Sequence, residues 1–123
     1  MTMTKCAICG KKMNIAKGEK GKYELKRHLV IDEFTNADWI PDAEGITERK
    51  EVRYSYSNRK GSEWLFEAVV DNSTYEGILI LADPDTYFEF NAVIIRGKNM
   101  KELKNKINKR FVKFFNDNMP FKK

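Results

Sequence analysis

The sequence predicts an α+β fold: a four- to five-stranded antiparallel sheet, arranged as a meander, with one C-terminal helix and a small N-terminal segment around two cysteines. Apolar and polar residues alternate in short runs between residues 46 and 95, and turn-forming residues separate these runs. After Gly97 the apolar residues recur at helical spacing instead. Since 123 residues is the usual length of one domain, we expect residues 1–123 to form a single domain.

The N-terminal segment, residues 1–22, is predicted to be knuckle-like. Its Cys6-Ala7-Ile8-Cys9-Gly10 run is similar to the turn of a zinc knuckle, where glycine lets backbone N–H groups point at the thiolates. A structural zinc takes four ligands, and the chain has no third cysteine and one histidine, His28. We predict His28 as third ligand and Asp32 as fourth, because both would share one strand face. Other carboxylates are nearly as suitable as the fourth ligand: Glu24 and Asp38.

A structural zinc is therefore the predicted cofactor, with Cys6, Cys9, His28 and Asp32 as its ligands. Four protein ligands leave no open position for water, so the ion would not be catalytic. The alternative is a metal-free cysteine pair with His28 as an ordinary surface or core residue. A redox dithiol is a third interpretation, but such dithiols lie at a helix N-terminus after a strand, a setting that the pattern does not predict here.

Residues 23–95 are predicted to hold the antiparallel sheet. A first strand is expected around Leu25–Ile31, followed by a loop at 35–45. The clearer strands alternate apolar and polar residues, and they are expected from Ile46 through Tyr56, at Glu63–Val70, at Glu76–Ala82 and at Thr86–Ile95. The turns between them are expected at Asn58–Gly61, Asp71–Thr74 and Asp83–Asp85.

A single helix is predicted over residues 98–118. Asn99 is a suitable N-cap, and Pro120 prevents the helix from continuing. One apolar stripe runs along this helix and is expected to pack on the sheet: Met100, Leu103, Ile107, Phe111 and Phe114.

The predicted sheet is apolar on both faces, which one helix cannot cover. One face is expected to carry Trp64, Phe66, Ala68, Val70, Phe88, Phe90, Ala92 and Ile94. The opposite face is expected to carry Leu65, Val69, Leu79, Leu81, Val93 and Ile95. We expect the N-terminal third to cover the second face, through Leu29, Ile31, Trp39 and Ile40. The alternative is that this face meets a partner.

Charge is segregated along the chain, although the net charge is only +5. Residues 1–27 carry eight basic against two acidic residues, a balance of +6, and residues 96–123 carry ten against two, a balance of +8. Residues 28–95 carry five against fourteen, a balance of −9. The basic ends suggest a nucleic-acid partner. The acidic middle suggests a protein partner with a basic surface that normally holds nucleic acid.

The composition favours a cytoplasmic, non-membrane protein. No run approaches the roughly 20 apolar residues of a membrane helix, and the N-terminus lacks a signal-peptide pattern. Both cysteines lie in one turn, which indicates reduced thiols and cytoplasmic residence, in the host cytoplasm if a phage encodes the protein. The abundance of Lys, Asn and Ile indicates an AT-rich genome, bacterial or phage.

The motifs favour a binding protein over an enzyme. His28 is the one histidine that could act as a base, and no Gly-x-Ser-x-Gly elbow or Gly-rich phosphate loop occurs. Pro41-Asp42 followed by Glu48-Arg49-Lys50 is similar to a metal-dependent nuclease pattern, but so loose a match is better interpreted as a solvated loop.

In general character the chain resembles the small phage-encoded inhibitors of CRISPR nucleases, through its single short domain, its Lys/Asn/Ile bias, its acidic stretch from Asp32 to Glu51 and its lack of catalytic residues. The resemblance implies a non-catalytic inhibitor that occupies a nucleic-acid-handling protein such as a CRISPR nuclease. From the charge pattern we expect the docking surface to be acidic, drawn from Asp32, Glu33, Asp38, Asp42, Glu44, Glu48 and Glu51.

The alternative is a small DNA- or RNA-binding domain that uses its knuckle and its basic helix. A sheet followed by one helix also resembles single-strand-binding coactivator domains in outline. The helix offers a basic face to phosphates: Lys98, Lys101, Lys104, Lys106, Lys109, Arg110 and Lys113. The sequence leaves the oligomeric state open.

Overall fold

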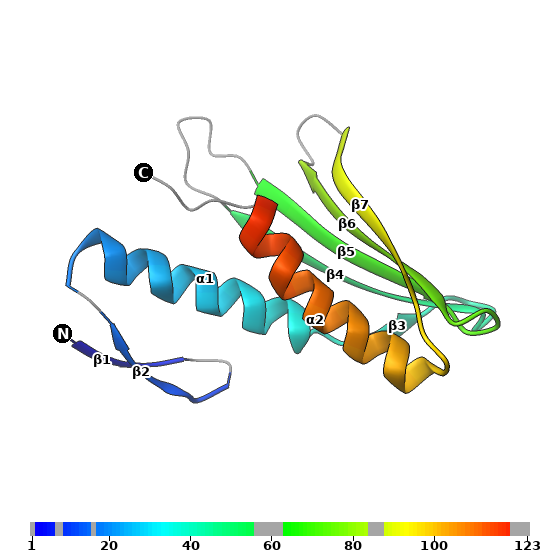
Figure 1. The fold of residues 1–123 in the computed structure, drawn as a ribbon, viewed down its shortest axis with the longest axis horizontal. Coiled ribbons are helices and arrows are strands. Elements are labelled where there is room, and N and C mark those ends of the chain that lie inside the picture. Colours follow the sequence, from blue (N-terminus) through cyan, green and yellow to red (C-terminus); the bar gives the residue numbers. More distant parts are fainter. Residues whose placement is uncertain (1, 7–8, 16, 56–62, 84–87, 119–123) are drawn as a thin grey trace.

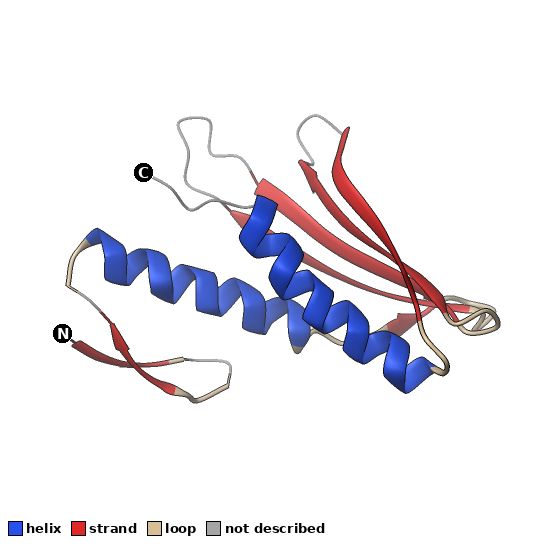
Figure 2. Cartoon of the chain, in the orientation of Figure 1, coloured by secondary structure: helices blue, strands red, loops and turns tan. Residues whose placement is uncertain are grey.

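The computed structural model describes residues 2–6, 9–15, 17–55, 63–83 and 88–118 and has an α+β fold, as predicted (Figures 1 and 2). A two-stranded and a five-stranded sheet accompany two helices in this part of the chain. In chain order the elements are β1 (Thr2–Lys5), β2 (Lys12–Ile15), α1 (Glu19–Thr35), β3 (Ile40–Pro41), β4 (Thr47–Ser55), β5 (Glu63–Asp71), β6 (Glu76–Asp83), β7 (Phe88–Arg96) and α2 (Met100–Asn118).

The five-stranded sheet is the predicted antiparallel meander. Its strands lie in the order β3-β4-β5-β6-β7, and every neighbouring pair is antiparallel. The turn between β5 and β6 forms where it is expected, because the Asp71 carboxylate accepts hydrogen bonds from the backbone N–H and hydroxyl of Ser73. The predicted turn at 58–61 lies outside the described residues, as does most of the turn at 83–85.

Helix α2 confirms the predicted C-terminal helix and its cap. The side-chain oxygen of Asn99 accepts a hydrogen bond from the Glu102 backbone N–H at 2.8 Å. The predicted stripe faces the sheet, and Leu103, Ile107 and Phe111 are almost completely buried. Neither α1 nor α2, the two helices in the described ranges, has the length and apolar character that a membrane crossing requires.

The strand predicted at Leu25–Ile31 is wrong, because these residues belong to α1, a second helix that the sequence pattern did not predict. The β-branched pair Val30-Ile31 and the helix-weakening Gly21 favoured a strand over a helix. Tertiary packing overrides that preference. Val30 and Phe34, one helical turn apart, are fully buried in the common core. The sheet therefore begins at β3 and not at residue 23.

The predicted assignment of strand faces is wrong for β6 and β7. Phe66 pairs with Leu81 and Ala68 pairs with Leu79, and directly paired residues point to the same side of a sheet. All four of these residues are buried under the helices. The same error applies to β7: Val93 and Ile95 lie on the helix side and Ile94 is 62% exposed, because Leu79 pairs with Val93 and Gly77 with Ile95.

The expectation that the N-terminal third covers the second face is also wrong. Helix α1 lies beside α2, and both helices cover the same face of the five-stranded sheet (Figure 1). Trp39 and Ile31 join that common core, whereas Ile40 is exposed. On the opposite face, no described element covers the apolar side chains of the central and β7-side strands, among which Ile78 and Ile94 are exposed.

Candidate metal centre and basic groove

The two cysteines lie at the turn of the hairpin formed by β1 and β2. The backbone N–H of Cys6 donates to the carbonyl of Lys11 at 2.9 Å, and that of Gly10 donates to the carbonyl of Cys6 at 3.0 Å. Gly10 has a φ of 74°, which glycine adopts without strain. The backbone N–H of Lys11 donates in turn to the Cys9 thiol. This is the backbone geometry that the knuckle-like sequence predicts.

Helix α1 brings the other two predicted ligands to the same turn. His28 and Asp32 are one helical turn apart, so their side chains share a face, and His28 Nε2 lies 2.9 Å from Asp32 Oδ2. Cys9 Sγ lies 3.4 Å from His28 Nε2, and Cys6 Sγ lies 3.2 Å from Asp32 Oδ2. The two ligands share a face because of the helix and not because of the predicted strand.

The four ligand atoms fit a tetrahedral ion. All of them lie within 4.8 Å of one another. In a tetrahedral zinc site with bonds of roughly 2.0–2.3 Å, ligand atoms lie about 3.3–3.8 Å apart. The three measured separations are at or slightly below that range, so the group needs only small side-chain shifts to hold a metal ion. The alternative carboxylates Glu24 and Asp38 are not in the group.

The site is electrostatically coupled. Burial tends to raise the pKa of Asp32, but hydrogen bonds from the Cys9 and Cys6 thiols and the nearby His28 outweigh burial and hold that pKa below its usual value. The hydrogen bond between the Cys9 thiol and the Asp32 carboxylate raises the pKa of the thiol. Thiol protons thus occupy the contacts that a cation would replace.

Several of the acidic residues predicted to dock a partner already have partners within the chain. Glu48 pairs with Lys104 at 3.0 Å, and both side chains are largely buried. Glu51 lies 3.4 Å from Arg53. Asp32 belongs to the group that could hold a metal ion. The acidic middle of the sequence is therefore partly neutralised by the protein's own basic residues.

The remaining acidic residues do not form one surface. Asp42 accepts a hydrogen bond from the hydroxyl of Thr47 at 2.9 Å, and that bond holds the pKa of Asp42 below its usual value. Glu33 is half-buried on α1. Asp38 and Glu44 are exposed, and neither has a hydrogen-bond or ion-pair partner in the described part of the chain.

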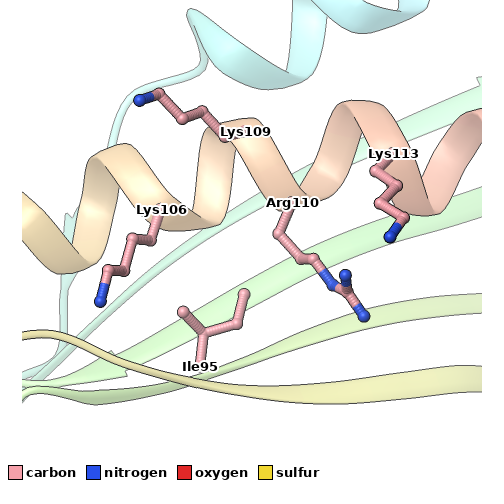
Figure 3. A pocket seen from close by; sticks show the side chains of 5 residues that line it. All are labelled: Ile95, Lys106, Lys109, Arg110 and Lys113. Atoms are coloured by element: carbon pink, nitrogen blue, oxygen red, sulfur yellow. The ribbon is translucent and has the colours of Figure 1, made fainter.

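The basic residues of α2 line a groove between this helix and β7. The groove is largely open to solvent and has a volume of about 330 Å³, and Ile95 of β7 contributes to its apolar wall. Figure 3 shows the side chains of Lys106, Arg110 and Lys113 directed to the side of α2 where Ile95 lies, while Lys109 points the other way. The sequence predicted a basic helix but not this groove, because the wall from β7 depends on how the helix packs.

The groove retains unneutralised charge. Lys106 pairs with Glu102 at 3.0 Å and donates a hydrogen bond to the carbonyl of Arg96 at 3.1 Å. In the described ranges, by contrast, no carboxylate lies within ion-pair distance of Arg110, Lys113 or Lys109. The groove can therefore attract an anion without breaking an existing ion pair.

Lys50 is a buried cation that the sequence reasoning missed. Its side chain is 1% exposed, and its Nζ donates to Asn108 Oδ1 at 2.8 Å and to the carbonyl of Thr35 at 3.4 Å. The ammonium also lies 4.7 Å from the ring centre of Phe34 and 4.9 Å from that of Trp39.

Burial changes the pKa of the Lys50 ammonium. Burial lowers the pKa of Lys50 to about 8, and the charge of Lys104 contributes to that lowering. The period of β4 could have revealed this residue, because Lys50 alternates in phase with Val52 and Tyr54, which pack on the core.

Two features of the described residues thus offer binding chemistry: the group formed by two cysteines, His28 and Asp32, and the basic groove. No protein-family model matches the sequence, no curated protein matches it, and no solved structure matches the fold.

Proposed function

We propose that the protein is a non-catalytic nucleic-acid-binding domain whose N-terminal hairpin is held by a structural zinc ion. The basic groove between α2 and β7 carries this proposal, because it combines unpaired cations with an open, concave shape. A binding role is favoured over a catalytic one because His28, the single histidine of the chain, lies among the metal ligands and is not free to act as a base.

Zinc is the metal that best suits the donor set. Two thiolates and an imidazole are preferred zinc ligands, and a carboxylate can complete the tetrahedron. The test is metal analysis of protein purified without added zinc, with an expected content near one zinc per chain. A content below about a tenth of an equivalent would contradict the structural role.

Phosphate is the ligand chemistry that best suits α2. Arg110 and Lys113 project into the groove, and the guanidinium of Arg110 can bind phosphate oxygens in a bidentate manner. The lining residues that the structure describes include no aromatic ring on which a base could stack. Binding is therefore proposed to depend on the backbone and to be largely independent of sequence.

Fluorescence anisotropy with labelled oligonucleotides tests this role. The observed affinity should fall as salt increases, with a slope that corresponds to about two or three phosphate contacts. Replacing Arg110 and Lys113 by Glu should weaken binding about tenfold or more. The matched control replaces Lys20 and Lys26, two exposed cations of α1, by Glu and should weaken binding less. Absence of salt-dependent binding to any oligonucleotide would refute the proposal.

A second proposal is that the protein is a phage-type inhibitor of a CRISPR nuclease or a similar protein. Its acidic docking surface would then be smaller than the sequence predicted. Asp38 and Glu44 support it, because both are exposed in the segment from α1 to β4, where side chains are free to meet a basic groove. A pull-down from the native host would distinguish the two proposals, since the inhibitor should capture a nuclease in the absence of nucleic acid.

A further inference from the structure

The two walls of the basic groove are joined at one end. Its two walls, β7 and α2, follow each other in the chain and are joined by residues 97–99. The two elements diverge from this connection in Figure 1. Near the same end the Nζ of Lys106 bridges the walls through its hydrogen bond to the Arg96 carbonyl. The chain connection and the Lys106 side chain thus lie across this end, where a polymer strand that follows the groove would meet them.

The hollow is shallow and largely open to solvent, and its volume matches a small group. About 330 Å³ lies near the lower limit of small-ligand pockets, which corresponds to roughly one nucleotide. Among the described residues the lining is mostly apolar, because Ile95 and the methylene stems of the basic side chains form it, and a sugar or the face of a base can rest there without specific recognition.

The charge of the hollow exceeds what an internal nucleotide supplies. Among the described lining residues, the three cations directed toward Ile95 (Lys106, Arg110 and Lys113), less the Glu102 carboxylate that pairs with Lys106, leave a net charge of +2. An internal phosphodiester brings one negative charge, whereas a terminal phosphate monoester brings about −1.5 to −2 at neutral pH and three acceptor oxygens. A strand end with a phosphate is therefore the better electrostatic match.

We propose that the groove binds the phosphorylated end of a nucleic-acid strand, with the terminal phosphate against Arg110 and Lys113 and the terminal nucleotide beside Ile95. This inference rests on the proposed nucleic-acid role and adds the part of the strand that is recognised. The shared chemistry is a terminal phosphate monoester, which either a 5′ or a 3′ end can supply.

The test compares four single-stranded oligonucleotides of one sequence at constant salt: 5′-phosphorylated, 3′-phosphorylated, unphosphorylated, and covalently circular. One of the two phosphorylated forms should bind about tenfold more tightly than the unphosphorylated form, which identifies the end, and the circle should bind most weakly. If the circle and the phosphorylated strands bind equally, end recognition is refuted while the nucleic-acid role stands. If none of the four binds, the nucleic-acid role itself fails.

Two variants separate end recognition from general attraction. Arg110→Ala should remove the preference for the phosphorylated end, and its exposed position makes misfolding a minor concern, which a thermal melt checks. Lys101→Ala, on an exposed part of the same helix, should lower affinity for all four oligonucleotides to a similar extent and keep the preference. A preference that survives Arg110→Ala would overturn the assignment of the groove. Equal or tighter binding of a poly-glutamate peptide would also overturn it in favour of an acidic protein ligand.

Discussion

The ring of Phe111 on α2 stacks on the ring of Phe34 on α1, with 3.9 Å between the ring centres and 17° between the ring planes. Phe111 also meets the edge of Phe66 on β5, at 5.5 Å between centres. One side chain thus joins both helices and the sheet. The helix that the sequence did not predict is held to the rest of the fold through this contact.

Phe111→Ala should be among the most destabilising single substitutions. Because the ring is 1% exposed and contacts both α1 and β5, its loss leaves a cavity that the helices cannot easily close. We expect a loss of about 3–5 kcal/mol in the free energy of unfolding, measured by urea denaturation. Val112→Ala, the half-buried neighbour, should lose about 1 kcal/mol or less. A loss below about 1 kcal/mol for Phe111→Ala would show that the stripe is not packed on the sheet.

Cys6→Ser should loosen the hairpin and leave the five-stranded sheet intact. The hairpin lies beside α1 and away from that sheet in Figure 1, so the metal ligands connect it only to its own neighbour. Hydrogen exchange should accelerate in β1 and β2 and stay unchanged in β5 and β6. Asn14→Ser, an exposed change on β2, serves as the control. Equal acceleration in β5 would contradict a local role.

Lys50 should make the protein more stable as the pH rises above about 8. The pKa of Lys50 is lowered from 10.5 to about 8 in the folded chain by burial, so below pH 8 both folded and unfolded chains hold the proton. Between these values the unfolded chain binds a proton that the folded chain has released, and stability therefore increases with pH.

The measurement is the urea midpoint at about pH 7 and about pH 10, compared between the protein and Lys50→Met. The difference between the two proteins isolates Lys50 from the other groups that titrate. Lys50→Met should lack the part of the increase that Lys50 causes. If both proteins change identically with pH, the ammonium is not desolvated in the folded state.

The acidic residues should separate into two classes. Glu48→Lys should lower the stability by on the order of 1 kcal/mol or more, because it places a cation beside Lys104 in a largely buried position. Asp38→Lys and Glu44→Lys should change stability by less than about 0.5 kcal/mol. If a protein partner docks on the acidic side, these two reversals should slow its association, most strongly at low salt. Unchanged association kinetics with a captured partner would exclude that surface.

The meander was predictable because its strands alternate regularly. The expected Glu63–Val70 strand differs from β5 by one residue, and Asp71 forms the turn that its side chain favours. The faces of β6 and β7 were not predictable in the same way. They depend on the pairing register, which places Leu79 opposite both Ala68 and Val93, and a one-residue change moves every side chain to the other face.

The candidate metal ligands could be proposed by elimination, since the chain offers two cysteines and one histidine. Asp32 was expected for a reason that proved wrong. A spacing of four residues places two side chains on one face of a strand and also on one face of a helix, so the inference survived the change of element. The groove was not predictable, because its walls at Ile95 and Arg110 meet only through the packing of α2 on the sheet.

Gly97 lies where β7 passes into α2. A Cβ atom at this position would lie 2.7 Å from the backbone nitrogen of Leu103 and 2.9 Å from its Cα, so any side chain here would push the first turn of the helix away from the strand. The angle at which the groove opens is thus controlled by a residue that carries no charge and makes no contact within the hollow. The shape of the groove depends on Gly97, whereas its charge comes from the basic side chains of α2. Mutation can therefore change the width of the groove and its attraction for anions independently.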